Sequence, residues 1–258
     1  KSEDDVRHIA TISANNDEKI GSLVALAINS AGKDGSITVE EARSIETSLD
    51  LVEGFRFGGG YVSPSFVNDE RRGAVVYTEP LIMVTDEKID NVQDILPVLE
   101  QIARESRPFI IVGSEFEGQG LAALIMNSIR GSMKVAAVKA PRYGEERKNI
   151  LKDLALSVGA TFVSRETGVR LKDARLEHLG TSRKVDVVKN ETTIIGGKGD
   201  PDEVVKRIDA LRVELEQTDS TYECERIQDR ISRLNSGVAV IRVGAATEIA
   251  MIEKRHRI

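Results

Sequence analysis

The feature that most constrains the fold is an alternation of short apolar runs with amphipathic segments through the middle of the chain. The runs are rich in β-branched residues, and the segments between them have the period of helices. This alternation is typical of βαβ units, so we predict an α/β domain with a largely parallel sheet flanked by helices. The expected strands are Leu81 to Thr85, Phe109 to Val112, Val135 to Val138, Thr161 to Ser164, Lys184 to Val188 and Thr192 to Ile195, and the expected helices are Asn91 to Arg104, Gly118 to Arg130 and Glu145 to Ser157.

The two ends of the chain carry further elements. Near the start, Asn15-Asn16-Asp17 can cap a helix that Gly32 ends, and the turn Asp34-Gly35 leads into a strand. The expected strands here are Ser36 to Val39 and Ser48 to Val52. Toward the end, the charged segment after Asp200 is predicted to form a helical hairpin broken near Thr218, followed by the strand Val238 to Val243 and a last helix from Ala245.

Glycines near residues 54 and 237 mark two points along the chain at which the pattern of apolar runs and helical segments changes. If both are crossings of the same boundary, the two chain ends form one small α+β domain, and the paired crossings make a hinge. We therefore expect residues 1–52 and 239–258 to form the small domain and residues 53–238 to form the larger one.

Two of the predicted helices carry more apolar surface than packing on one sheet requires. In the second of them the apolar residues cover roughly 200° of the helical wheel, about twice the usual stripe. An exposed apolar surplus of this kind suggests a site for apolar partners. The residues concerned are Leu121, Leu124, Ile125, Met126 and Ile129 in one helix, and in the other Ile95, Val98 and Ile102 on one side with Val92, Leu96, Leu99 and Ala103 toward a second side.

Composition excludes several classes of function. The chain has 258 residues, 40% of them hydrophobic and 30% charged, with a net charge of −6. The negative charge argues against nucleic acid as a partner, and no run is long enough to span a membrane. A single cysteine, Cys224, fits a reducing, cytoplasmic compartment. The chain begins at Lys1 with neither a signal peptide nor a methionine, so we expect a piece of a longer protein.

The search for catalytic machinery identifies no catalytic residue and no phosphate loop. The three histidines lack metal-ligand spacing, so we expect no metal site. One alternative remains open, a nucleotide-dependent α/β enzyme using Gly118 to Ala123, which fits the dinucleotide pattern G-x-G-x-x-A. Against it, Glu115 and Glu117 would repel a pyrophosphate, and the position of the ribose-binding acid is Lys139.

Several strings are more specific than these patterns, and they closely resemble the group I (bacterial GroEL-type) chaperonins. The resemblance covers the apical domain and both halves of the intermediate domain of that family, whereas the equatorial domain with its nucleotide loop is absent at both ends. The strings are Thr11-Ile-Ser-Ala-Asn15, Gly35-Ser-Ile-Thr-Val-Glu40, Val52-Glu-Gly54, Gly60-Tyr-Val-Ser-Pro64, Leu96-Pro-Val-Leu-Glu100, Lys134-Val-Ala-Ala-Val-Lys-Ala-Pro141 and Val243-Gly-Ala-Ala-Thr-Glu248.

The resemblance implies a molecular chaperone fragment that assists ATP-dependent protein folding by a parent ring. In the family, two apical helices and an extended segment bind non-native polypeptides and, in competition, the mobile loop of a GroES-type co-chaperonin. Taken singly, apolar residues at helical spacing more often face a core, and Tyr61 and Phe66 could simply pack a loop. The positions that the resemblance assigns to binding are Tyr61, Phe66, Leu96, Leu99, Leu121, Ile125 and Met126, with polar contacts from Asn127 and Arg130.

The resemblance also implies that ATP and Mg²⁺ bind the missing domain, so no cofactor and no ATPase activity are expected here. The parent forms seven-membered homo-oligomeric rings, and we expect this chain alone to be monomeric or weakly associated. The hinge positions are Gly54, Gly237 and Ser236, which replaces a glycine. Glu248 is the intersubunit position, but its usual basic partner is replaced by Gly59.

Two departures concern the binding surface itself. Ser65 stands where the family usually has an aromatic residue, and Met126 replaces a smaller aliphatic one. Because methionine is flexible and adapts to varied partners, we expect affinity and selectivity at this surface to differ from those of other members.

Overall fold

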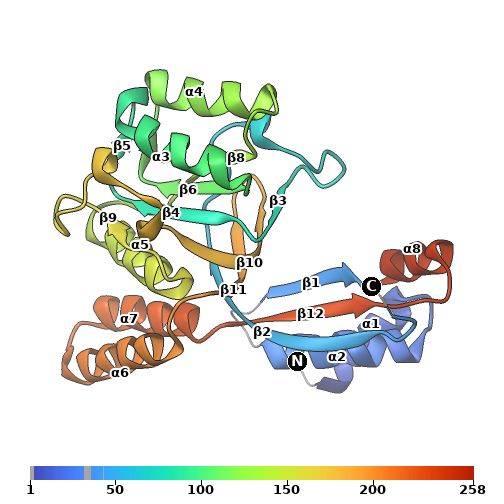
Figure 1. The fold of residues 1–258 in the computed structure, drawn as a ribbon. Helices are drawn as coiled ribbons and strands as arrows, with labels where there is room; N and C mark the ends of the chain where they lie inside the picture. The colour runs from blue at the N-terminus through green and yellow to red at the C-terminus, as the bar shows by residue number, and fades with distance from the viewer. Residues whose placement is uncertain (1–2, 32–35, 43) are drawn as a thin grey trace. The chain divides into compact units, whose positions relative to one another are not determined.

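The computed structural model describes residues 3–31, 36–42 and 44–258, and the chain forms two compact units (Figure 1). One unit comprises residues 1–54 and 236–258, and the other comprises residues 55–235. The boundaries predicted from the sequence, at 52/53 and 238/239, lie two to three residues from these boundaries between the units. Both chain ends therefore belong to one unit, and the middle of the chain to the other.

The smaller unit is a three-stranded sheet with helices. Its central strand pairs in parallel with one neighbour and antiparallel with the other. A small core forms where buried Ala27 and Ala31 meet Ala239, Ile241 and Val243. The elements are α1 (Glu3–Ser13), α2 (Glu18–Ala31), β1 (Ser36–Glu41), β2 (Ser48–Phe57), which continues into the larger unit, β12 (Gly237–Val243) and α8 (Glu248–Arg257).

Local sequence explains the helical pair of this unit. The Asp17 carboxylate accepts hydrogen bonds from the amides of Lys19 and Ile20, which is the predicted cap of α2. The first helix, α1, was not predicted. It packs on α2 so closely that a Cβ on Gly21 would lie 2.0 Å from Thr11 Oγ1. The predicted helix end at Gly32 and turn at Asp34-Gly35 lie outside the described residues.

Four parallel strands form the centre of the larger unit, in the spatial order β9-β4-β6-β8. The chain passes through β4, β6 and β8 in one direction and then returns to the other side of β4. Right-handed crossovers consequently place α3 and α4 on one face and α5 on the other (Figure 1). The elements are β4 (Leu81–Thr85), α3 (Val92–Glu105), β6 (Phe109–Gly113), α4 (Gly118–Ile129), β8 (Val135–Lys139), α5 (Gly144–Val158) and β9 (Phe162–Val163).

The remaining strands of this unit are antiparallel, so the sheet is mixed. The α/β class is confirmed, but the prediction of a largely parallel sheet is wrong. The physical reason is that β10 pairs antiparallel with β3, β4 and β11, and the turn from β10 to β11 needs no crossover helix. The additional elements are η1 (Pro64–Phe66), β3 (Val75–Thr78), β5 (Lys88–Ile89), β7 (Glu115–Phe116), η2 (Leu171–Asp173), η3 (Leu176–His178), β10 (Gly180–Val187) and β11 (Thr192–Gly197).

The predicted helical hairpin is present as α6 (Pro201–Gln217) and α7 (Thr221–Leu234). Asp200 and Ser220 cap these helices by accepting hydrogen bonds from backbone amides. A buried ion-pair cluster fixes the hairpin to α5. The Asp153 carboxylate on α5 is 2% exposed and accepts two hydrogen bonds from Arg230 of α7, at 2.7 and 2.9 Å, and one from Arg207 of α6 at 3.3 Å.

This cluster predicts a large stability effect. In Asp153→Ala, the buried Arg230 loses its counter-ion, which should lower the free energy of unfolding by about 3–5 kcal/mol. Asp209→Ala, which removes an exposed partner of Arg212, should cost less than about 1 kcal/mol. Urea denaturation of both variants measures the difference, and equal small losses would show that the buried cluster does not hold the hairpin.

Candidate functional site

The two helices with an apolar surplus, α3 and α4, are neighbours in the larger unit (Figure 1). Asn91 caps α3 through a hydrogen bond from the Gln93 amide to its side chain at 3.0 Å. At the start of α4, the Gly120 amide donates to the Asp90 carbonyl at 2.8 Å. A Cβ on Gly120 would lie 3.1 Å from Ile89 Cγ2, so glycine permits this close approach between the two segments.

Each helix buries one side and exposes apolar residues on another. Leu124 of α4 and Ile95, Val98 and Ile102 of α3 are in the core. On the outer side, Leu96 is 45% exposed, Met126 is 44% exposed and Ile129 is 63% exposed. Leu121 and Ile125 are half-buried and pack against the core from its edge. We call these five outer residues, Leu96, Leu121, Ile125, Met126 and Ile129, the α3–α4 apolar surface.

Two residues that the resemblance assigned to binding are instead part of the core. Leu99 is 5% exposed and Phe66 is 1% exposed, so neither side chain is open to a partner. Leu99 lies on the same turn as Val98 and faces inward with it, and Phe66 is the last residue of η1, which contacts α4 and β8. The binding role that the resemblance assigns to these two side chains requires exposure, which this structure does not give them. Here both side chains pack in the core and support the fold.

The extended segment before η1 is only partly open. Tyr61 is half-buried, bridges to Val138 of β8 and packs against the core, so only part of the residue is accessible. Ser65 is exposed and its amide is capped by the Ser63 hydroxyl at 3.2 Å. A serine at this position thus presents a small polar side chain where an aromatic one would extend the apolar surface.

The polar positions at the end of α4 differ from each other. The Asn127 side chain donates to the Ala123 carbonyl at 2.9 Å and accepts from the Ser132 hydroxyl at 3.0 Å. Its hydrogen-bonding groups are therefore partly used in ending the helix. Arg130 follows the last turn of α4 and is exposed, so its guanidinium is the more available group for contacts with a partner.

The glycines of the dinucleotide-like pattern are used for packing. A Cβ on Gly118 would lie 3.0 Å from the Asp90 carbonyl oxygen, and the Gly120 amide is already bonded to that oxygen. A pyrophosphate needs free amides at the start of such a helix. Glu117 also forms an ion pair with Lys88 immediately before the helix, which adds a negative charge where a phosphate would bind.

The predicted hinge residues lie where the two units join in sequence. The Gly54 amide donates to the Ser236 carbonyl at 3.3 Å, and the Ser236 hydroxyl donates to the Gly54 carbonyl at 3.1 Å. Neither Gly54, Ser236 nor Gly237 has a positive φ. Serine is therefore accommodated at position 236 without backbone strain, and its hydroxyl adds a bond between the two strands.

The two positions of the proposed intersubunit pair are also explained locally. A Cβ on Gly59 would lie 2.3 Å from the Lys139 carbonyl oxygen, so no larger residue fits here without movement of the backbone. Glu248 is exposed in the first turn of α8, which Thr247 caps. A basic side chain at position 59 is thus excluded by packing in this chain.

The binding positions implied by the family resemblance leave out one residue of the surface, Ile129, although the helical wheel includes it. Ile129 is the most exposed apolar residue of α4, and it belongs to the apolar arc of that helix, which was the signal available.

Within the described residues there is no cluster of acidic, histidine or cysteine side chains able to hold a metal ion. No helix in that part of the chain is long and apolar enough to cross a bilayer. No model of a known protein family matches the chain.

The division between core and surface predicts opposite effects for neighbouring residues. Phe66→Ala and Leu99→Ala should lower the free energy of unfolding by about 2–5 kcal/mol, because each leaves a cavity in the core. Leu96→Ala and Met126→Ala should each cost less than about 1 kcal/mol, since these side chains are already half exposed. Thermal or urea denaturation of the four variants tests this, and a costly Met126→Ala would place that residue in the core.

Proposed function

We propose that this chain is a polypeptide-binding module of a group I chaperonin-type molecular chaperone. The single observation that supports this most is the α3–α4 apolar surface, in which two adjacent helices expose apolar residues although each already buries another side in the core. Isolated exposed apolar residues are common in proteins, but several on two neighbouring helices are typical of a binding surface.

The surface suits partners that are apolar but varied in sequence. Its residues are aliphatic or methionine, without aromatic or buried charged groups that would select one particular partner. Burial of apolar area contributes about 25 cal/mol per Å² and is not directional, so segments of many sequences can bind. Met126 increases this tolerance, because its unbranched side chain adapts to differently shaped neighbours.

Exposed segments of non-native proteins have this chemistry, either extended or as amphipathic helices lying along the two helices. We propose them, and the mobile loop of a GroES-type co-chaperonin, as the partners. Arg130 would add a polar contact at the end of α4, and Tyr61 an apolar one at the edge. Leu99 and Phe66 would act only by holding the helix and the 3-10 turn in place.

The rest of the proposal concerns the parent protein. The parent would be a cytoplasmic, homo-oligomeric ring in which a further domain binds ATP and Mg²⁺. Rotation about the paired strands at Gly54 and Ser236 would move the binding surface within that ring. This chain would then bind clients without hydrolysing ATP. The competing proposal, a nucleotide-dependent enzyme using Gly118 to Ala123, would be favoured by saturable binding of NAD in a calorimetric titration.

The direct test is a variant in which the exposed apolar residues become polar. Leu96→Ser, Leu121→Ser and Met126→Ser together should reduce the affinity for a permanently unfolded protein, reduced and carboxymethylated α-lactalbumin, by at least about tenfold. The physical reason is the loss of apolar contact area at the α3–α4 surface. Fluorescence anisotropy of the labelled α-lactalbumin measures the change.

A matched control is Val205→Ser with Val213→Ser, which removes two exposed apolar residues from α6. This control should bind the unfolded protein as the unmodified chain does. Circular dichroism and a urea transition check that both variants fold. Equal affinity of the triple variant and the control would contradict the proposal.

A further inference from the structure

A second candidate site lies at the carboxyl ends of the parallel strands. The chain runs β4, β6, β8 and then returns to place β9 on the other side of β4. The connections leaving β4 and arriving at β9 therefore lie on opposite faces of the sheet. In open α/β sheets such a reversal leaves a crevice beyond the strand ends, and ligands commonly bind there.

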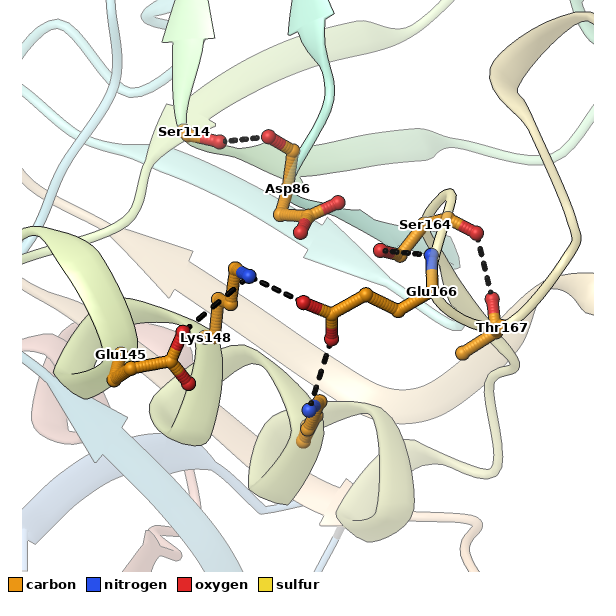
Figure 2. Close-up of polar contacts among 8 residues, drawn as sticks. Asp86, Ser114, Glu145, Lys148, Ser164, Glu166 and Thr167 are labelled. Carbon is orange, nitrogen blue, oxygen red and sulfur yellow. Dashed lines mark hydrogen bonds and ion pairs between the residues drawn. The ribbon is translucent and has the colours of Figure 1, made fainter.

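The crevice is occupied by a pocket with a volume of about 540 Å³, large enough for a small organic molecule. Asp86 follows β4, Ser164 and Glu166 follow β9, and Lys148 projects from α5 (Figure 2). Glu87, next to Asp86 in the chain, also lines the pocket. A smaller hollow shares Asp86 and Lys148 and extends to Ser114, which follows β6. We call the larger cavity the charged pocket. It contains none of the residues of the α3–α4 apolar surface.

Some of its charges are neutralised within the protein. Lys148 forms ion pairs with Glu166 and, at 3.4 Å, with Glu145, and Lys152 lies 3.3 Å from Glu166 (Figure 2). The hydrogen bond from Lys148 lowers the pKa of Glu166 and raises that of Lys148, so both remain charged at neutral pH. Lys88 is likewise paired with Asp90 and Glu117.

The acids on the β4–α3 side of the pocket have no such partner. The side chains of Asp86, Glu87 and Asp94 are half-buried, and within the described residues none is in a hydrogen bond or ion pair. Glu87 Oε1 is inaccessible to solvent and lacks a hydrogen-bond donor. Several partly desolvated carboxylates close together cost free energy unless a cation or a hydrogen-bond donor reaches them.

The segment after β9 brings the complementary charge to the pocket. Arg165, Arg170 and Lys172, from the segment after β9, are exposed, and no ion pair engages them in the part of the chain that the structure describes. Among the charges without an ion-pair partner, the acids thus come from the β4–α3 connection and the bases from the segment after β9. Arginine side chains are well suited to hold a carboxylate, because their donors match its two oxygens.

Other ligand classes fit this arrangement less well. The acids do not gather closely enough within the described residues to hold a metal ion. A polyphosphate would meet no net positive charge, because five acids (Asp86, Glu87, Asp90, Asp94, Glu166) balance five bases (Lys88, Lys148, Arg165, Arg170, Lys172). The first turn of α5 also carries Glu145 and Glu146, which disfavours phosphate there.

We propose that the charged pocket binds a small zwitterion of the amino-acid class. Its guanidinium or ammonium group lies against Asp86, Glu87 and Asp94, and its carboxylate lies against Arg165 and Arg170. The pocket donates a charge-assisted hydrogen bond to one end of the ligand and accepts one from the other end. This inference does not depend on the chaperone proposal.

Two probes that differ in one group test the assignment. L-arginine carries both a guanidinium and a carboxylate, whereas agmatine is the same molecule without the carboxylate. In calorimetric titrations of the full chain, L-arginine should bind saturably and more tightly than agmatine. In Arg165→Gln with Arg170→Gln, the affinity for L-arginine should fall about tenfold while the affinity for agmatine is unchanged. In Asp86→Asn both affinities should fall.

Two controls keep the test specific. Arg212→Gln removes an arginine of α6 outside the pocket and should leave both affinities unchanged. The triple serine variant of the α3–α4 apolar surface should also bind L-arginine normally, so failure of one proposal is distinguishable from failure of the other. Absence of saturable L-arginine binding, or equal losses of both probes in the double arginine variant, would overturn the assignment.

Discussion

The structure of the larger unit depends on burial of its parallel strands on both faces. Every residue of β4 and β6 is buried, which requires a helical layer on each side. On one side this layer is α3 and α4, and each can present only one face to the sheet. With about 100° between successive residues, burying Leu124 turns Met126 away from the sheet, just as burying Ile95 turns Leu96 outward.

The exposed apolar residues are consequently a feature of the sequence rather than of incomplete packing. A helix that serves only to cover a sheet has polar residues on its outer face. The outer positions of α3 and α4 instead hold leucine, isoleucine and methionine. Their solvation is a cost in free energy that the buried strands and the Asp153 cluster of this unit have to offset. The proposed binding role would account for their presence.

Much of the fold follows from sequence, because strong periodicity and turn chemistry act locally. The strand Leu81–Thr85 matches its predicted bounds, and the helices and the cap at Asp17 lie within a few residues of theirs. The antiparallel part of the sheet was not predictable in the same way. Strand β3 is short, and the pairing of β10 with β3 and β4 depends on contacts distant in sequence.

The candidate site was predicted only in part, for the same reason. A helical wheel identifies Leu96, Met126 and Ile129 as lying away from the buried stripe, but it cannot say where the buried sector ends. Leu99 and Phe66 are covered by neighbours distant in sequence, which only tertiary packing determines. The charged pocket could not be predicted at all, since its unpaired acids and bases come from segments about 80 residues apart.

The central claim is that the apolar residues between α3 and α4 contact non-native polypeptide. Methyl-labelled nuclear magnetic resonance of the chain during titration with reduced, carboxymethylated α-lactalbumin tests it most directly. The account predicts that signals of Leu96, Leu121, Ile125, Met126 and Ile129 shift or broaden first, while those of the core residues Leu99 and Leu124 change little. Perturbations centred on another face of the chain, or none at concentrations that saturate other chaperone modules, would contradict it.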